Sequence, residues 1–460
     1  MTDKAATDLS CFKAYDIRGR LGDNLDEDIA RIVGQGFAEA LGARRVVLGR
    51  DIRASSESLA AAVAEGLTAQ GADVLDIGLS GTEEMYFATT ALGADGGICV
   101  TASHNPMDYN GMKMVKAGSA PLDPETELGA VKARAEAGGF APAAKPGRVI
   151  ASDDVRGAYV ERVLSFVDVA ALRPLKVLVN AGNGAAGPTF DAIFAALEAA
   201  GAPIEVERLH HAPDGSFPNG IPNPLLPENQ PVTAEAVVAA GADLGVAWDG
   251  DFDRCFLFDA TGAFIPGEYV VGLLADAFLA KEPGAKIVHD PRVVWNTLDV
   301  VTAAGGEAVQ SRTGHAFIKQ KMRETNAVYG GEMSAHHYFR DFVACDSGMI
   351  PWLLVVELMG RTGKPLAELV DARRAAFPSS GEINFRVEDV AAAVARVEAA
   401  FAPGAVARDD TDGLSLAQAD WRFNLRASNT EPLLRLNVEA RGDAGLVAQK
   451  VAEITALIAG

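Results

Sequence analysis

The stretch that decides the fold and the chemistry of this chain is GADGGICVTASHNPMDYN, residues 93–110. Residues 98–100 form a short apolar run after two glycines, and the run ends in the polar hexapeptide of residues 101–106. This pattern predicts a buried strand whose carboxyl end leads into a loop. We expect the hydroxyl of Ser103 to be exposed there while the sheet holds its backbone, so Ser103 is a candidate nucleophile.

The loop around Ser103 also has a plainer interpretation. Serine and asparagine before a proline are common in ordinary turns, so the loop alone does not establish a nucleophile. Ser103 lacks the flanking glycines of the G-x-S-x-G turn, which argues against a hydrolase of that type. The rest of the chain has to decide between a polar turn and a reactive serine.

The composition is that of a large globular protein. The chain has 460 residues, 49% of them hydrophobic and 22% charged, which suits roughly three or four domains. A formal net charge of -21 argues against nucleic acid or an anionic membrane surface as a partner. The four cysteines show no C-x-x-C spacing and the N terminus has no apolar segment, so we expect reduced thiols and a cytoplasmic protein without a signal peptide or membrane span.

One structural plan recurs three times along the chain: a strand, a polar corner, an amphipathic helix, a glycine and a second strand. The first strands are expected at residues 45–48, 176–179 and 286–288, and the second strands at residues 73–77, 204–206 and 308–309. Strands that alternate with helices are typical of α/β domains with mainly parallel sheets.

Each copy of the plan ends in a third strand and a polar loop. The three loops contain residues 101–104 (TASH), 248–251 (WDGD) and 331–334 (GEMS). Ligands of open α/β sheets bind outside the carboxyl ends of the strands. We therefore expect the three loops to face one shared cleft.

Small residues and prolines mark two breaks, at residues 137–147 and 377–381. After the second break the pattern changes to alternating strands with two helices, which predicts a smaller α+β domain. The expected domains are residues 1–150, 151–256, 257–376 and 377–460.

Three aspartates, Asp249, Asp251 and Asp253, stand at alternate positions of the second loop. Their carboxylates can converge on one hard cation, and Mg²⁺ fits best because it favours few protein carboxylates together with a phosphate oxygen. An EF-hand is excluded, since Arg254 and Ala260 occupy its sixth and twelfth positions. Arg254 could bind a carboxylate or a phosphate. The alternative is an acidic turn at the end of a strand.

Two further loops carry groups suited to a sugar phosphate. One offers donors only, as a phosphate dianion requires, from Arg426, Ser428, Asn429 and Thr430, although it could also be a polar turn. In the other, Glu332 and Ser334 are expected on the same side of an extended segment, which suits two neighbouring sugar hydroxyls. His104 beside Ser103 and His315 in a Thr-Gly-His sequence are the two histidines least expected to be merely structural.

A dinucleotide-binding protein is the rival class. Gly182, Gly184 and Gly187 form a G-x-G-x-x-G sequence after a strand, with Glu205 and Glu207 about twenty residues further on. That function would leave Ser103, the aspartates and the Arg426 loop without a role. A glycine-rich packing turn explains the same residues.

The four motifs in this order, TASHNP at 101–106, DGDFDR at 249–254, GEMS at 331–334 and RASNT at 426–430, resemble the α-D-phosphohexomutase superfamily over essentially the whole chain. The likeness is greatest to bacterial phosphomannomutases and dual phosphomannomutase/phosphoglucomutases. It implies three similar α/β domains with mixed, mainly parallel sheets and a C-terminal α+β domain, similar to TATA-binding protein, around a central cleft. It also implies interconversion of hexose 6-phosphate and hexose 1-phosphate, of mannose and also of glucose, through a phosphoserine and a hexose 1,6-bisphosphate, with phosphoglucomutase as the alternative main activity.

The resemblance also implies roles for single residues. Ser103 would be phosphorylated and would bind Mg²⁺ with Asp249, Asp251 and Asp253, and hexose 1,6-bisphosphate would activate the enzyme. Lys113 and His315 would be acid/base residues, and contacts to the substrate or its phosphate would come from Tyr15, Arg18, His336, Arg426, Ser428, Asn429 and Thr430. Sugar phosphates would be the partners of a monomer or weak homo-oligomer.

The chain departs from the family pattern at two positions, and the residue at a third position bears on substrate specificity. Ala335 stands where many relatives have glycine, and Arg292 stands where several have lysine, which gives a bulkier donor to a phosphate or hydroxyl. Met333 argues against the phosphoglucosamine mutases, which usually carry glutamine there. If Glu332 and Ser334 bind O3 and O4, the C2 hydroxyl that distinguishes mannose from glucose is not contacted, so we expect both sugars to react.

Overall fold

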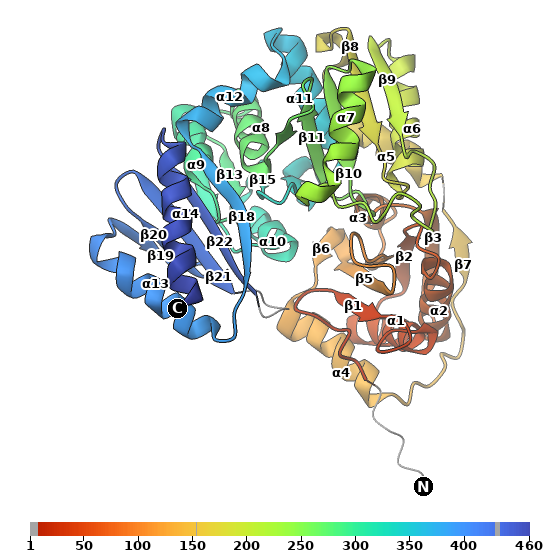
Figure 1. Ribbon diagram of the computed structural model, residues 1–460. Helices are drawn as coiled ribbons and strands as arrows, with labels where there is room; N and C mark the ends of the chain where they lie inside the picture. The colour runs from red at the N-terminus through yellow and green to blue at the C-terminus, as the bar shows by residue number, and fades with distance from the viewer. Residues whose placement is uncertain (1–7, 153, 428–432) are drawn as a thin grey trace. The chain divides into compact units, whose positions relative to one another are not determined.

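The computed structural model describes residues 8–152, 154–427 and 433–460. The chain divides into two compact units, one formed by the chain up to Ala263 together with Asp341–Arg361, the other by Phe264–Arg340 and Thr362–Gly460. Two sheets with their helices make up the first unit, and two more make up the second (Figure 1).

The first sheet has the strand order β1-β5-β4-β2-β3-β7. Its strands are β1 (Ile17–Arg20), β2 (Arg45–Arg50), β3 (Asp73–Leu79), β4 (Gly96–Val100), β5 (Tyr109–Lys116) and β7 (Val149–Ala151). Its helices are α1 (Glu27–Leu41), α2 (Ser56–Ala69), α3 (Thr82–Ala91) and α4 (Gly129–Ala137). Strands β4, β2, β3 and β7 are parallel, whereas β5 runs antiparallel to both β4 and β1.

The second sheet contains the order β11-β10-β8-β9. Its elements are β8 (Leu175–Asn180), β9 (Ile204–Leu209), β10 (Leu244–Trp248), β11 (Cys255–Asp259), α5 (Val155–Leu164), α6 (Ala186–Ala199) and α7 (Pro231–Ala240). Helix α11 (Met349–Thr362) packs on this part of the first unit, where the ring of Trp352 lies 5.5 Å from that of Phe190.

In the second unit, the third sheet contains the order β14-β13-β15-β16. Its elements are α8 (Gly267–Lys281), β13 (Lys286–His289), α9 (Trp295–Ala303), β14 (Glu307–Gln310), α10 (His315–Thr325), β15 (Tyr329–Gly331), β16 (His337–Phe339) and α12 (Leu366–Ala376). The short strands β6, β12 and β17 span Ala120–Pro121, Phe264–Ile265 and Cys345–Asp346.

The threefold repeat predicted from the sequence is confirmed by the strand order. In each α/β sheet the first strand of the copy is flanked by the second on one side and the third on the other, and an antiparallel strand follows the third. Because β4, β10 and β15 are the third strands, the three predicted polar loops occupy equivalent strand ends. The α/β class is therefore confirmed.

The last domain is α+β, as predicted, with the fully antiparallel order β18-β22-β21-β20-β19. Its strands are β18 (Ser379–Arg386), β19 (Ala407–Asp409), β20 (Leu414–Ala417), β21 (Trp421–Ala427) and β22 (Leu433–Ala440). Helices α13 (Val390–Phe401) and α14 (Ala444–Ala459) lie on one face of this sheet (Figure 1). Strand β18 begins inside the expected break, and the irregularity is confined to a register shift between Ser379 and Glu382.

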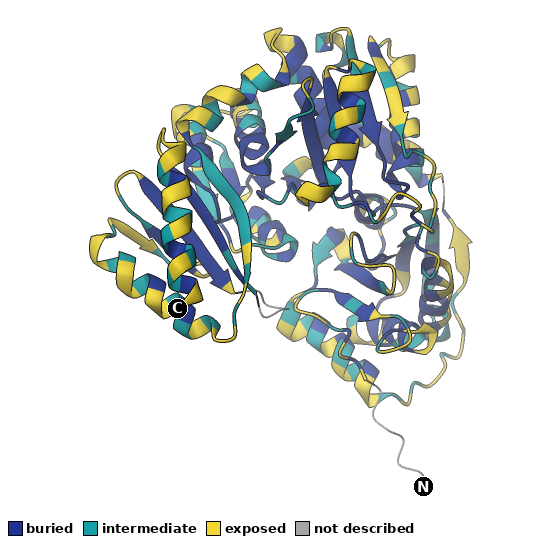
Figure 2. Cartoon of the chain, viewed as in Figure 1, coloured by how far each residue is buried: buried dark blue, intermediate teal, exposed yellow. Residues whose placement is uncertain are grey.

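Helix ends and core follow simple chemistry. Asp26, Asp389 and Asp443 precede α1, α13 and α14, and each side chain accepts a hydrogen bond from a backbone N–H of the first turn. The central strands are buried and the outer faces of the helices are exposed, as Figure 2 shows. Among the residues described, no helix combines the length and the apolar character needed to cross a bilayer.

A buried carboxylate joins three helices of the first unit. Glu83 on α3 accepts hydrogen bonds from the Tyr159 hydroxyl of α5, from Ser347 Oγ at 2.9 Å and from the amide of Met349 at 3.3 Å, at the start of α11. Burial raises the pKa of Glu83 to about 8. Several donors therefore converge on one acceptor group, which fixes α11 against the first sheet.

Candidate active site

Ser103 lies in the loop after β4, with its side chain enclosed. Its Oγ donates a hydrogen bond of 2.6 Å to Asp249 Oδ2 and lies 3.0 Å from His104 Nδ1. The expectation that this hydroxyl is exposed was wrong: Ser103 is only 2% exposed, because the Asp249 loop covers it. Ser103 also has φ 48°, a strained backbone conformation for a residue other than glycine.

The three aspartates of the loop after β10 converge as predicted. Asp249, Asp251 and Asp253 are all buried, and each offers a carboxylate oxygen within 4.8 Å of the others. Within the described residues, Asp249 Oδ1 and Asp251 Oδ1 are buried without a hydrogen-bond donor. Buried oxygen acceptors without donors are what a hard divalent cation requires, so the residues fit a metal ion.

Two buried cations partly neutralise these carboxylates. Lys113 Nζ on β5 lies 2.8 Å from Asp251 Oδ2 and also contacts Asp253, while Arg254 Nε donates to Asp249 Oδ2 at 2.9 Å. Burial alone would raise the pKa of Asp249, but the Arg254 guanidinium holds it below the ordinary value. Likewise, burial would lower the pKa of Lys113, but Asp251 and Asp253 raise it.

Two threonines that sequence reasoning did not select hold Asp251. Thr82 Oγ1, at the start of α3, donates to Asp251 Oδ2 at 2.8 Å, and Thr101 Oγ1 donates to the same oxygen at 3.1 Å. Both belong to the domain of the first sheet, Thr82 on α3 and Thr101 directly after β4, whereas Asp251 follows β10 of the second sheet. Thr101 was within the quoted TASHNP motif, but nothing in the spacing pointed to Thr82.

A buried arginine, also missed, orders the serine loop. Arg53 is 3% exposed, and its guanidinium donates to the carbonyl oxygens of Ser103 at 2.9 Å, Pro106 at 2.8 Å and Tyr109 at 3.2 Å. The ring of Phe217, from the second domain, lies 5.8 Å from the guanidinium carbon. Arg53 follows β2 at the same edge of the sheet as Ser103, which was the available signal.

Two predicted residues, Arg18 and His104, contact this loop or its aspartate partner. Arg18 on β1 donates to Asn105 Oδ1 at 2.9 Å and to Asp16 Oδ2 at 3.0 Å, and Tyr15 is half-buried two residues before β1. His104 contacts the Arg254 guanidinium; although 40% of its side chain is exposed, loss of solvent around the ring and that positive charge lower the pKa of His104 to about 4. Arg18 and His104 therefore lie close to Ser103, as predicted.

In the second unit, Arg292, Glu332, Ser334 and His336 form one cluster. Arg292 Nη2 donates to Ser334 Oγ at 3.2 Å and lies 3.6 Å from Glu332 Oε1, and His336 Nδ1 lies 3.3 Å from Ser334 Oγ. The amide of Gly314, directly before His315, donates to Glu332 Oε1 at 2.9 Å. The predicted residues of this loop therefore lie together.

The prediction of an extended segment around Glu332 and Ser334 was wrong. Residues 332–336 form a tight turn between β15 and β16, closed by hydrogen bonds from the Glu332 amide to the His336 carbonyl and from the Ala335 amide to the Glu332 carbonyl, both 3.0 Å. Ala335 has φ 70°, in the left-handed region that favours glycine. The turn therefore keeps a conformation suited to glycine although the residue is alanine.

Arg426 contacts Glu382, an acidic residue that sequence reasoning missed. Its Nη2 donates to Glu382 Oε2 at 3.0 Å, and Arg292 Nη1 lies 3.5 Å from the same oxygen. Ser428, Asn429 and Thr430 lie outside the described residues.

The G-x-G-x-x-G sequence serves packing. A Cβ on Gly187 would meet the His211 carbonyl oxygen at 2.1 Å, and one on Gly184 would meet the Gly250 carbonyl oxygen at 3.0 Å. The glycines therefore allow close approach of backbone segments within the protein, as the packing-turn alternative states.

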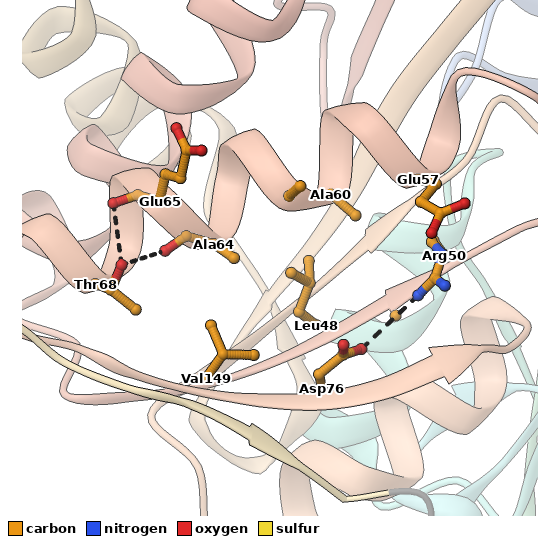
Figure 3. A pocket seen from close by; sticks show the side chains of 11 residues that line it. Leu48, Arg50, Glu57, Ala60, Ala64, Glu65, Thr68, Asp76 and Val149 are labelled. Atoms are coloured by element: carbon orange, nitrogen blue, oxygen red, sulfur yellow. Dashed lines mark hydrogen bonds and ion pairs between the residues drawn. The ribbon is translucent and has the colours of Figure 1, made fainter.

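A hollow of about 360 Å³ lies elsewhere in the first domain (Figure 3). Helix α2 and strands β2, β3 and β7 line it with apolar side chains and with Arg50 and Asp76, whose charged atoms are 3.9 Å apart. None of the residues predicted for the site is among those that line it.

The Ser103 hydroxyl is hydrogen-bonded to one of three carboxylates that fit a divalent cation. The chain also groups arginines with polar side chains that can bind sugar hydroxyls. These features are those of a phosphoryl-transfer enzyme. Family models for phosphoglucomutase/phosphomannomutase match the chain in four parts: domains I, II and III (all alpha/beta/alpha) at residues 10–140, 157–262 and 266–377, and the C-terminal domain at residues 382–457. The chain belongs to the phosphoglucomutase/phosphomannomutase family and is a phosphohexomutase, which interconverts hexose phosphates.

Named relatives agree with this assignment. The chain is 61% identical to a phosphomannomutase of Salmonella typhimurium, over 98% of this chain and 99% of the relative. It is 57% identical to phosphohexose mutases of Xanthomonas campestris, over 98% of this chain and 100% of the relative. A solved phosphoglucomutase/phosphomannomutase family protein from Burkholderia thailandensis is 36% identical with a TM-score of 0.86, and the match covers 97% of both chains.

Replacing Gly250 with alanine should separate the serine from the aspartates. A Cβ there would lie 2.5 Å from the Ser103 carbonyl oxygen, so one of the two loops must move. Since a displacement of about 1 Å at a reacting group can cost about 100-fold in rate, we expect kcat in a mutase assay to fall by about that factor.

The matched control is Gly157→Ala, on α5 of the same unit, where a Cβ would have nothing within 4 Å. It should leave kcat unchanged. A Gly250→Ala enzyme with kcat within about threefold of wild type would show that the two loops need not touch for catalysis.

Proposed function

We propose that this phosphohexomutase converts mannose 6-phosphate and mannose 1-phosphate into each other, and the glucose pair as well, with Ser103 carrying the phosphoryl group. The observation that supports this most strongly is the 2.6 Å hydrogen bond from Ser103 Oγ to Asp249, one of the three buried aspartates. A phosphoserine there would carry about -1.5 to -2 charges.

Mg²⁺ is the cation proposed for the aspartates. Asp249, Asp251 and Asp253 would hold it together with an oxygen of the phosphorylated Ser103, which matches its preference for few carboxylates and a phosphate. When bound, it would neutralise charge on the transferring phosphoryl group. Lys113, whose ammonium lies against Asp251 and Asp253, would hold those carboxylates in place and balance their charge.

The reaction would proceed in two transfers. In the first, the bond between Ser103 Oγ and phosphorus breaks while a bond forms from phosphorus to O6 of a hexose 1-phosphate, which gives a hexose 1,6-bisphosphate. The O6 proton passes to a base and Ser103 Oγ takes up a proton, with Lys113 and His315 as the acid/base candidates. The bisphosphate then turns end for end, and its 1-phosphate returns to Ser103.

The remaining predicted residues would hold the substrate. Arg18, Tyr15, Arg292, His336 and Arg426 would contact it, with Ser428, Asn429 and Thr430 completing the phosphate-binding loop. Phosphoryl transfer requires positioning and neutralised charge more than covalent chemistry, so such a set suffices. An enzyme that has lost its phosphoryl group would regain it from hexose 1,6-bisphosphate, which would make that compound an activator.

Glu332 and Ser334 would bind the O3 and O4 hydroxyls. Their placement on one turn beside Arg292 supports this, since two adjacent hydroxyls need an acceptor and a second polar group close together. Glucose and mannose share the configuration at C3 and C4, so the pair would not distinguish them.

Ser103→Ala should abolish turnover of hexose 1-phosphate even with hexose 1,6-bisphosphate present, because it removes the hydroxyl that would carry the phosphoryl group beside Asp249. The assay follows formation of hexose 6-phosphate, with thermal unfolding as the check on folding. A rate near that of wild type would remove Ser103 from the mechanism.

Both sugars should react at useful rates. A preference above ~10⁴ in kcat/KM requires a dedicated polar contact to the distinguishing hydroxyl. We expect the ratio between mannose 1-phosphate and glucose 1-phosphate to stay well below this value, and one comparison of kcat/KM measures it. A larger ratio would mean that a residue contacts the C2 hydroxyl.

A further inference from the structure

Three arginines of the second unit share one carboxylate. Glu382 Oε2 lies 3.0 Å from Arg426 Nη2 and 3.5 Å from Arg292 Nη1, and Glu382 Oε1 lies 3.4 Å from Arg435 Nη1. Arg292 also pairs with Asp290 at 2.8 Å, and Arg426 lies 3.8 Å from Asp412. Glu382 is therefore the residue that links all three guanidinium groups.

The sheet explains why an anion is needed at this place. Arg426 on β21 and Arg435 on β22 are directly opposite each other in the antiparallel pair. Like charges in that position destabilise a sheet. Glu382 on β18, the other neighbour of β22, reaches both and removes the repulsion.

These arginines still have donors to spare. Within the described residues, the Nε atoms of Arg292, Arg426 and Arg435 are buried and have no hydrogen-bond partner. Buried N–H groups without acceptors are costly, and guanidinium donors suit phosphate oxygens. Burial alone would raise the pKa of Glu382, but Arg292 and Arg426 lower it, so the carboxylate is ionised near neutral pH.

We propose that Arg435 is part of the phosphate-binding set and that Glu382 is an internal anion that competes with the substrate phosphate for these arginines. The proposal rests on the proposed function, in which Arg292 and Arg426 bind a phosphate. The bisphosphate has to reverse its orientation in each catalytic cycle. Its phosphate must therefore leave the arginines after binding them. Competition from Glu382 keeps that binding weak and release fast.

A merely structural role for Glu382 predicts the opposite sign. If it only positions the arginines, its loss should disorder them and weaken phosphate binding. If it competes, its loss should strengthen phosphate binding, because phosphate then supplies the negative charge that Glu382 no longer offers to both Arg426 and Arg435.

The test compares Glu382→Gln with wild type, both as the full chain carrying Ser103→Ala so that no turnover occurs. Isothermal titration calorimetry with inorganic phosphate gives the Kd. We expect Glu382→Gln to bind phosphate at least about fivefold more tightly, since coupling between close charges in binding sites is of that order or larger. In the active enzyme, which keeps Ser103, Glu382→Gln should lower both kcat and KM.

The matched control is Glu388→Gln, which removes the same charge from an exposed position of the same domain. It should leave the Kd unchanged. A Kd for Glu382→Gln that is equal to or weaker than that of wild type would overturn the proposal, as would an equal gain in Glu388→Gln or the absence of measurable phosphate binding in both proteins.

Arg435→Gln keeps the proposal testable if Glu382→Gln does not fold. It should weaken phosphate binding by at least about tenfold, as loss of a charge-assisted contact does, and an unchanged Kd would overturn the role of Arg435. Phosphate binding is measured without turnover, so failure of the Ser103 mechanism would leave these results intact. Conversely, unchanged Kd values with an inactive Ser103→Ala enzyme would reject only the roles of Glu382 and Arg435.

Discussion

The carbonyl oxygen of Ser103 lies so close to the backbone of Gly250 that a Cβ there would be only 2.5 Å away. This contact brings the loop after β4 against the loop after β10, and the contacts between the serine loop and the aspartates require the two loops to be this close. With the loops together, Ser103 reaches Asp249. Asp251 is reached by Lys113 of β5, by Thr82 at the start of α3 and by Thr101 directly after β4. Glu83 of α3 binds the start of α11 and Arg53 binds the serine loop, and both contacts help to keep the two sheets in this position.

Charge burial sets the second constraint. Three ionised carboxylates cannot be buried together without partners, because desolvation costs several kcal/mol per ion. Lys113 and Arg254 meet part of that requirement. Asp249 Oδ1 and Asp251 Oδ1, which find no hydrogen-bond donor in the described part of the chain, suit a divalent cation. The second unit shows the opposite arrangement, in which Glu382 partly satisfies three arginines whose Nε donors suit an anion.

Local patterns were enough to predict the repeated strand and helix plan, because alternation of apolar and polar residues and the glycine corners act within each segment. The same patterns placed Ser103, the aspartates and Glu332 at strand ends. They did not single out Arg53, although it follows a strand at the same edge as Ser103, and they could not reveal Thr82 or Glu382. The partners of these two lie far away in sequence: Thr82 bonds to a residue 169 positions on, and Glu382 to Arg426, 44 positions on. For the same reason the burial of Ser103 was missed, since the loop that covers it belongs to another domain.

The central claim is that Ser103, held against Asp249, is the residue that exchanges a phosphoryl group with the sugar. The most direct measurement is to incubate the dephosphorylated enzyme with hexose 1,6-bisphosphate labelled in its phosphate groups, and to locate the label by mass spectrometry of peptides. The account predicts label on Ser103 that unlabelled hexose 1-phosphate then discharges. Label on another residue, or label on Ser103 that the sugar phosphate does not remove, would contradict it.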